Sequence, residues 1–208
     1  MTFEHPPTLP PQRLTDRKRL AVISAATEEF LQAGFDATSM DRIAARACVS
    51  KRTVYNHFPS KEALFAAILV QLWEASSTGG SPAYRPDAPL RPQLLDLLMR
   101  KIRLSSDDAL ISLARVAIAA GIHSPERARD MVARLGEREE DLTVWIRAAA
   151  GDGRLKLTDP LFASQQLQGM VKGFAFWPQV TMGQPPLSQA EQAKIAEATA
   201  DMFLGHYA

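Results

Sequence analysis

Residues 51–58, KRTVYNHF, place several hydrogen-bonding side chains on one side of a short predicted helix. Val54 and Phe58 are four positions apart and would share the apolar face, because successive helical residues are rotated by about 100°. The opposite face would then carry four polar side chains, Arg52, Thr53, Tyr55 and Asn56. Guanidinium, hydroxyl and carboxamide groups are those that read base edges in the major groove of DNA. The spacing therefore predicts a helix whose exposed face binds DNA.

The residues before this helix predict another short helix and a turn, which complete a helix-turn-helix. Thr38 and Asp41 have the spacing of a capping box, in which side chains satisfy the free N–H groups at a helix start. Four apolar residues follow at helical spacing, Met40, Ile43, Ala44 and Ala47. Ser50 can cap the second helix, and Pro59 and Ser60 would end it and begin a third.

Basic residues are concentrated in the same stretch. Between residues 42 and 61 there are five basic residues and no acidic one, whereas the whole chain has 24 basic and 23 acidic residues. A phosphate backbone would be attracted by such a concentration of charge. The alternative is an ordinary solvated surface, but caps, spacing and charge all favour DNA. Five residues are expected to position the protein on phosphates: Thr38, Ser39, Lys51, His57 and Lys61.

The motif also resembles a known family, the TetR-type bacterial transcriptional regulators. The matching segments are Gly34-Phe35, Ala37-Thr38-Ser39, Ile43-Ala44, Val49-Ser50-Lys51, Thr53, Tyr55 and Phe58 to Leu64. Two residues depart from the family pattern, since both Cys48, in the turn, and Arg52 stand where the family often has glycine. If the turn requires a positive φ, Cys48 would cost about 1 kcal/mol or more. A thiol-based redox sensor is an alternative role for Cys48, although a small turn residue is the favoured one.

The predicted fold is all-α in two domains, because apolar residues recur every three or four positions and no strand-like alternation is found. Residues 1–14 contain four prolines and are expected to form a mobile arm. Residues 15–60 would form the DNA-binding domain, with a first helix over 16–33 that ends at Gly34. Basic residues that follow the arm could reach a minor groove, or could simply be solvated.

Residues 61–208 would form a helical domain for regulation and dimerisation. Expected helices cover 61–76, a region around 94–102, 107–118, 125–150, one beginning at Asp159-Pro160, and one capped by Ser188 and Glu191. Trp177-Pro178 should end or kink the helix before it, and Gly136 could bend or split the helix over 125–150. The segment 107–118 is apolar almost all round, with only Arg115 charged, and is expected to be the buried centre.

Composition bounds the possible functions. No run of 18 apolar residues is present and the N-terminus lacks a signal-peptide core, so a cytoplasmic protein without membrane contact is expected. The single cysteine excludes an internal disulfide and a cysteine-built zinc site. The four histidines are scattered and no catalytic motif is found, so no enzyme activity, metal or cofactor is expected. A helical module that binds only protein is the remaining alternative.

A homodimer on a palindromic operator is expected on physical grounds. One short helix makes only a few base contacts of roughly 1–3 kcal/mol each, and a two-fold dimer doubles them. The expected interface lies on the last two helices, which the family also uses. Its residues are Gly169, Gly173, Phe174 and Met202. The Gly-x-x-x-Gly spacing permits close helix approach, although in a soluble protein it is about as often incidental.

A small-molecule effector is implied by the resemblance, because these regulators bind ligands in the second domain and release DNA. Large side chains that could line such a pocket are Trp145, Phe162, Phe176 and Trp177, each of which could instead be plain core. Arg115 could meet an anionic ligand or an acidic partner within the protein. Repression is favoured over activation, because it requires only that a promoter be occupied.

Overall fold

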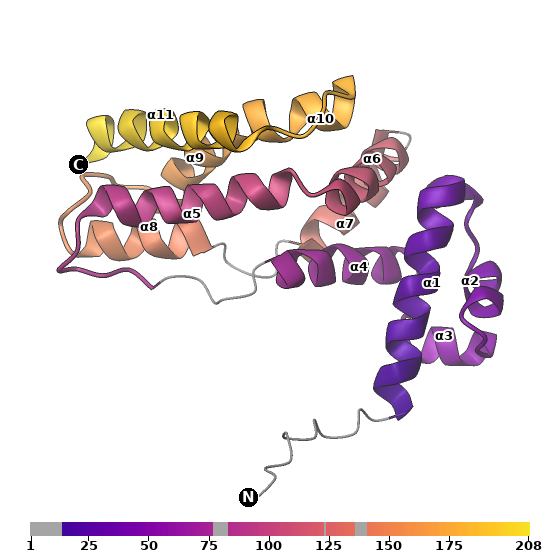
Figure 1. The fold of residues 1–208 in the computed structure, drawn as a ribbon. Helices are drawn as coiled ribbons and strands as arrows, with labels where there is room; N and C mark the ends of the chain where they lie inside the picture. Colours follow the sequence, from indigo (N-terminus) through magenta and orange to yellow (C-terminus); the bar gives the residue numbers. More distant parts are fainter. Residues whose placement is uncertain (1–13, 77–82, 123, 136–140) are drawn as a thin grey trace, which may run out of the picture. The chain divides into compact units, whose positions relative to one another are not determined.

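The computed structural model describes residues 14–76, 83–122, 124–135 and 141–208. Within these ranges the chain forms helices and no strand, which confirms the all-α fold (Figure 1). It divides into two compact units, residues 1–65 and 66–208, and each is considered by itself. The predicted arm lies almost wholly outside the described residues, as do two of the four histidines, His5 and His123.

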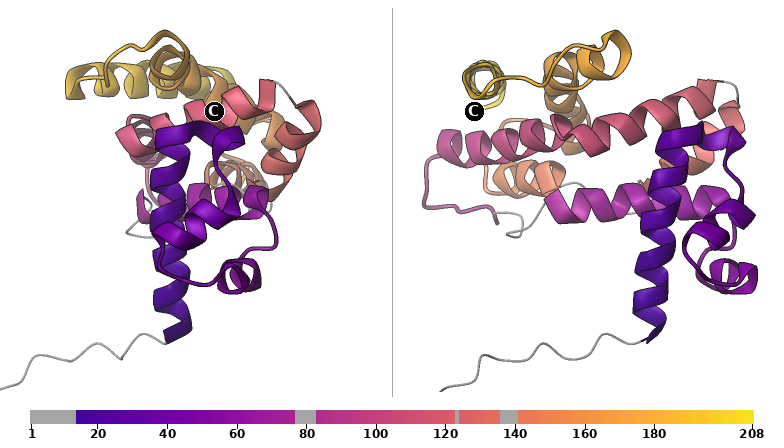
Figure 2. Two further views of the ribbon diagram at one scale, coloured as in Figure 1. Left: turned by 90° about the vertical axis from the view of Figure 1, so that its right-hand side faces the viewer. Right: turned by 45° about the vertical axis from the view of Figure 1, so that its right-hand side comes forward.

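The first unit consists of α1 (Leu14–Ala37), α2 (Met40–Arg46), α3 (Lys51–His57) and the start of α4 (Lys61–Ser76). Helices α2 and α3 lie beside α1 (Figure 2). Three aromatic rings pack together in the core, and the Phe65 ring lies nearly perpendicular to those of Phe30 and Phe35, at centroid distances of 4.9 and 5.5 Å. Such edge-to-face pairs stabilise a core beyond the area they bury.

Gly34 interrupts α1 as the sequence predicted. Its φ of 78° and ψ of 175° lie outside the helical region, and the helical turn that follows reaches Ala37. Glycine adopts a positive φ without the steric penalty of other residues. Phe35, directly after this break, is turned into the core and is 3% exposed.

The second unit is built around α5 (Leu90–Ser105), α8 (Asp141–Gly151), α9 (Pro160–Ala175) and α11 (Gln189–Tyr207). These four helices supply a continuous apolar core, and α11 packs on both α5 and α9 (Figures 1 and 2). The unit also contains α6 (Asp108–Ile122), α7 (Pro125–Leu135), α10 (Trp177–Met182) and the part of α4 from Ala66 on.

Several predicted helix ends are confirmed. The Asp159 side chain accepts a hydrogen bond from the Phe162 N–H at 3.0 Å, and Pro160 is the first helical residue of α9. Ser188 and Glu191 form a reciprocal capping box at the start of α11. The predicted interruption near Trp177-Pro178 lies at Phe176, the cap residue between the end of α9 at Ala175 and the start of α10 at Trp177. The predicted helix over 125–150 is two helices, and Gly136 lies in the undescribed segment between them.

The prediction that residues 107–118 form the buried centre is wrong. Of α6, only Ile111, Leu113 and Ala120 are buried, and the apolar core of the unit does not include it. An apolar composition shows that a helix has little affinity for water, but not which neighbours are available to cover it. Arg115 is exposed, and its guanidinium points to α10 rather than to an acidic partner.

Candidate nucleic-acid interface

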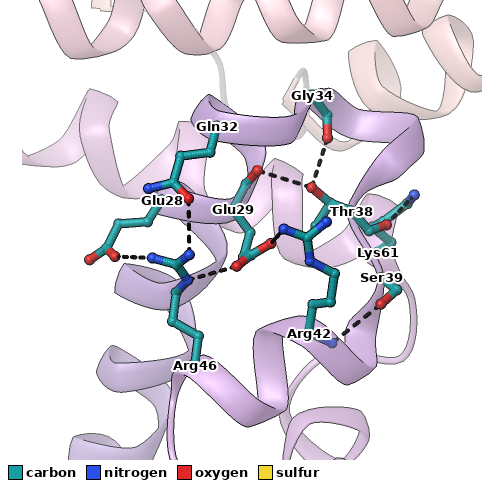
Figure 3. Close-up of polar contacts among 9 residues, drawn as sticks. All are labelled: Glu28, Glu29, Gln32, Gly34, Thr38, Ser39, Arg42, Arg46 and Lys61. Carbon is teal, nitrogen blue, oxygen red and sulfur yellow. Dashed lines mark hydrogen bonds and ion pairs between the residues drawn. The ribbon is translucent and has the colours of Figure 1, made fainter.

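The cap of α2 differs from the prediction by one residue. Ser39, not Thr38, is the N-cap, and its hydroxyl accepts a hydrogen bond from the Arg42 N–H at 3.2 Å. Thr38 is 2% exposed, and its hydroxyl points inward to the carbonyls of Glu29 and Gly34 (Figure 3). The capping box from Thr38 to Asp41 is therefore wrong, and Thr38 is not available to a phosphate in this conformation. Ser39 is exposed, and its contact with a phosphate stays a prediction.

Lys61 ties the start of α4 to the turn between α1 and α2. Its Nζ donates hydrogen bonds to the carbonyls of Phe35 at 2.6 Å and Thr38 at 2.8 Å. The same ammonium lies 4.5 Å from the centre of the Phe35 ring, a cation–π distance. This internal role differs from the predicted contact with a phosphate.

Two arginines of α2 are neutralised by carboxylates of α1. Arg46 pairs with Glu28 at 2.8 Å and with Glu29 at 2.7 Å, while Arg42 lies 2.8 Å from the second oxygen of Glu29 (Figure 3). Hydrogen bonds to the two glutamates raise the pKa of Arg46 above its ordinary value. Glu29 is 3% exposed, so its charge is buried between α1 and α2.

The basic stretch of the sequence is thus less positive in the fold than its composition indicates. Lys51 also pairs with a carboxylate, Asp41, at 2.8 Å, which raises the pKa of Lys51. Both partners are well exposed, so the pair is weak and a phosphate can compete for the lysine. Among the described residues, the Arg52 guanidinium forms no ion pair or hydrogen bond.

Helix α3 has the two faces that the sequence predicts. Ser50 caps it, accepting a hydrogen bond from the Thr53 N–H, while Val54 and the C-cap residue Phe58 are buried. On the opposite side Arg52, Tyr55 and Asn56 are exposed, with Tyr55 44% exposed. Thr53 and His57 are half-buried, at the edges of this face. The exposed group combines a cation, an amide and a phenol on one short helix.

The turn between α2 and α3 contains strain. Cys48 has a φ of 52°, the only positive φ of a non-glycine residue in the described ranges. The conformation lets the Cys48 and Val49 N–H groups donate to carbonyls of Ala45 and Ala44. Residues other than glycine rarely adopt a positive φ. The condition stated from the sequence, that the turn requires a positive φ, is met at Cys48.

The residues predicted to line a ligand pocket are not gathered at one place. Trp145 is 1% exposed and belongs to the core around α5, α8, α9 and α11. Phe162 and Trp177 are 54% and 46% exposed, and Phe176 packs edge-on against Trp177 at 5.1 Å. The Arg115 guanidinium donates to the carbonyls of Gln179 at 2.6 Å and Val180 at 3.2 Å. Only Arg115, Phe176 and Trp177 therefore have a common neighbourhood, at α10.

The residues predicted to form a dimer interface lie on the surface of the second unit. Phe174 and Met202 are 61% and 67% exposed. Gly169 and Gly173 are exposed on α9, and a Cβ added at either would meet nothing within 4 Å. Val171, between them, points into the core instead. The outer face of α9 is accordingly open and flat at its two glycines.

Sequence reasoning missed the residues whose partners are distant along the chain. Glu28, Glu29 and Gln32 hold Arg46, and their only sequence signal is a pair of arginines four positions apart on α2. Gln179 was also missed. It is 2% exposed, and no compositional pattern marks it.

Two other properties bear on the kind of site. In the described ranges, no three His, Cys, Asp or Glu side chains gather where they could hold a metal ion. None of the described helices has both the length and the apolar character needed to cross a membrane.

This geometry is that of a helix-turn-helix DNA-binding unit followed by a second helical unit, and known proteins share it. Residues 22–68 match the family model of bacterial regulatory proteins of the tetR family. Residues 92–208 match the model of the AefR-like transcriptional repressor C-terminal domain. The chain belongs to the TetR family of bacterial transcriptional regulators.

Individual relatives are similar over most of their length. The HTH-type transcriptional regulator RutR of Escherichia coli strain K12 is 30% identical over 176 residues, which are 81% of this chain and 79% of RutR. A TetR family regulator from Pseudomonas syringae pv. tomato str. DC3000 is 52% identical with a TM-score of 0.76, covering 93% of this chain and 98% of that one. The flavonoid-responsive regulator FrrA is 31% identical with a TM-score of 0.74, covering 91% and 96%. These relatives are transcriptional regulators rather than enzymes.

Proposed function

We propose that the protein is a repressor that binds a palindromic operator as a homodimer and leaves it when a small molecule binds the second unit. The observation that carries the DNA-binding part is the exposed face of α3. It presents Arg52, Tyr55 and Asn56 to solvent while Val54 and Phe58 hold the helix in place. Arg52 has no partner within the described structure, so its guanidinium is free to bind guanine in bidentate fashion. Action on chromosomal DNA would place the protein in the cytoplasm.

The proposed DNA contacts separate into two groups. Arg52, Thr53, Tyr55 and Asn56 would read bases, because they lie on or beside the exposed face of α3. Ser39, at the start of α2, and Lys51 and His57, at the two ends of α3, would bind phosphates, which fix position without reading sequence. Binding of phosphates would require Lys51 to leave Asp41, and the weakness of an exposed pair permits that exchange.

The experiment compares Arg52→Ala with the parent on an operator selected from random duplexes. Affinity, measured by fluorescence anisotropy at fixed salt, is expected to fall by about 1–3 kcal/mol, with weaker discrimination at one base pair. Arg103→Ala is the matched control, since this arginine is exposed on α5 of the second unit. Equal operator affinity of Arg52→Ala and parent would reject the reading role. A module that binds only protein would show no salt-dependent DNA affinity at all.

Dimerisation is proposed through the outer face of α9 together with α11. Phe174, next to Gly173 on α9, and Met202 on α11 are exposed apolar side chains, and positions 169 and 173 of α9 have no side chain. Exposed apolar groups and a pair of glycines one turn apart on a helix fit a closely packed second helix. A second copy is proposed as the occupant, because two-fold symmetry would match a palindrome.

The proposed effector is a small aromatic compound. FrrA, similar to this chain over nearly its whole length, is flavonoid-responsive, and the second unit carries adjoining aromatic rings at Phe176 and Trp177. A reporter gene placed downstream of the selected operator tests whether the protein represses or activates transcription. Expression should rise when the protein is deleted and when effector is added. Loss of expression on deletion would indicate activation instead.

A further inference from the structure

One buried hydrogen-bond acceptor of the second unit has no protein partner. The Oε1 atom of Gln179, on α10, is inaccessible to solvent and accepts no hydrogen bond. The residue is 2% exposed. Glu29 Oε2 is the other described buried oxygen without a hydrogen bond, but it is paired with Arg42 at 2.8 Å. Such an acceptor destabilises the fold, because it loses its hydrogen bonds to water and forms none within the protein.

The orientation of the Gln179 carboxamide follows from its neighbour. The Nε2 atom lies 3.4 Å from the Phe174 carbonyl, to which it donates. Exchanging the two ends of the amide would bring its oxygen against that carbonyl oxygen, which is repulsive. The unpartnered atom is therefore the acceptor, and what it lacks is a donor.

The backbone carbonyl of Gln179 has a hydrogen-bond donor, whereas the side-chain Oε1 atom has none. Arg115 of α6 donates to the carbonyls of Gln179 and Val180, near the end of α10. A cation at the C-terminal end of a helix also complements the helix dipole. Phe176, the cap residue between α9 and α10, lies three residues before Gln179 and is half-buried beside Trp177. The corner between α9 and α10 thus combines a fixed backbone, an aromatic surface and one acceptor.

We propose that Gln179 Oε1 accepts a hydrogen bond from a neutral hydroxyl group of an aromatic effector bound at the corner between α9 and α10. This rests on the proposed ligand response of the second unit and specifies its chemistry. A neutral hydroxyl fits because it supplies the missing donor without bringing a charge into a desolvated site. The ring that carries the hydroxyl would pack against Phe176. Arg115 acts as a positioning residue, since it holds the α10 backbone that presents Gln179.

The test uses two probes that differ by one donor, 7-hydroxyflavone and 7-methoxyflavone, and the variant Gln179→Met. Methionine has nearly the shape of glutamine and lacks the acceptor. Calorimetry should show that the parent prefers the hydroxy compound by about tenfold, the effect of one buried hydrogen bond. In Gln179→Met this preference should fall to about twofold or less. Gln189→Met, at an exposed glutamine of α11, should keep the full preference.

Ligand-induced shifts in melting temperature provide an independent readout. Because Gln179→Met removes the Nε2 donor to the Phe174 carbonyl as well as the Oε1 acceptor, the two proteins are compared by these shifts and not by their melting temperatures without ligand. At equal concentration 7-hydroxyflavone should raise the melting temperature of the parent more than 7-methoxyflavone does, and the two shifts should be equal in Gln179→Met. Equal affinity of the parent for both probes, binding of neither, or a preference that survives in Gln179→Met would overturn the proposal.

Release of the protein from the selected operator distinguishes two proposals: the hydrogen bond to Gln179 Oε1, and the loss of DNA binding when an effector binds the second unit. If both flavones release the parent from DNA with equal potency, ligand sensing stands and the role of Gln179 fails. If neither flavone releases DNA although Gln179 governs their binding, the acceptor site stands and the proposed response fails. Operator affinity without flavone should be the same in Gln179→Met and parent, because Gln179 is not part of the DNA-binding unit.

Discussion

Cys48 is a single residue that strains the helix-turn-helix, and the strain can be measured. Cys48→Gly should stabilise the protein by about 1 kcal/mol, because glycine adopts the φ of 52° without a steric penalty. Urea unfolding of the two proteins measures the difference. Ala45→Gly, an exposed position of α2, is the control and should destabilise by about 1 kcal/mol. If Cys48→Gly also destabilises, the turn is not strained.

Lys61 has two candidate roles that one variant separates. Lys61→Met keeps most of the apolar stem and removes the donors to the carbonyls of Phe35 and Thr38. The free energy of unfolding should fall by about 1–3 kcal/mol, the usual effect of losing charged hydrogen bonds. The salt dependence of DNA binding, measured where both proteins are folded, should stay the same. A slope lower by about one with unchanged stability would instead support the phosphate contact.

Sequence patterns located the exposed residues of α3 but not the internal partners of α2. Val54 and Phe58 fixed which side of α3 faces inward, and the opposite side followed from helix geometry. Thr38 and Ser39 are adjacent hydroxyl residues, and either could have capped α2. Only the packing of Gly34 and Glu29 decides that Thr38 turns inward. Neutralisation of Arg46 likewise depends on residues 17 and 18 positions away.

Among the helices, the contact between α5 and α11 should depend on pH. Arg91 lies 2.7 Å from Asp201, and hydrogen bonding to Arg91 lowers the pKa of Asp201. A carboxylate with a lowered pKa stabilises the fold above its unfolded pKa of about 3.9, and this contribution is lost as the pH falls through the folded pKa. Asp201→Asn should therefore be less stable than the parent at pH 7, and the difference should shrink below about pH 4.

Urea unfolding at several pH values from 8 to 3 measures this difference. Asp87→Asn is the control, because Asp87 is exposed and forms no ion pair in the described structure. It should follow the parent at every pH. A difference between Asp201→Asn and parent that persists undiminished at pH 3 would show that it does not arise from the ionised carboxylate.

Element boundaries were more predictable than burial. Caps at Ser50, Asp159 and Ser188 are local features, because a side chain and its partner N–H lie within three residues. Burial of α6 was not predictable, since it depends on which other helices cover it. The contacts of the segment 83–89 were likewise not predictable. Gln93 and Arg154 hold its carbonyls, and their positions in sequence do not indicate that contact.

At the scale of the whole molecule, the short α3 helix constrains how the protein can act. Its exposed face offers only a few base contacts, each worth roughly 1–3 kcal/mol. Specific binding in a genome requires more than one such helix can provide. Two copies related by a two-fold axis would double the contacts, so the proposed reading of DNA depends on a dimer surface in the second unit.

Gly173 provides the sharpest test of that surface. A Cβ added at this exposed position meets nothing within 4 Å in its own chain, so Gly173→Leu should fold normally and gain helix propensity. In the proposed dimer the same leucine would overpack a close helix contact, which typically costs about 1–3 kcal/mol. The dimer dissociation constant, measured by analytical ultracentrifugation, should rise about tenfold or more, and operator affinity should fall with it. Gly173→Ala should have a smaller effect, and Ala119→Leu, at an exposed position of α6, should have none. If Gly173→Leu dimerises as tightly as the parent, the outer face of α9 is not the interface and a second copy must bind elsewhere.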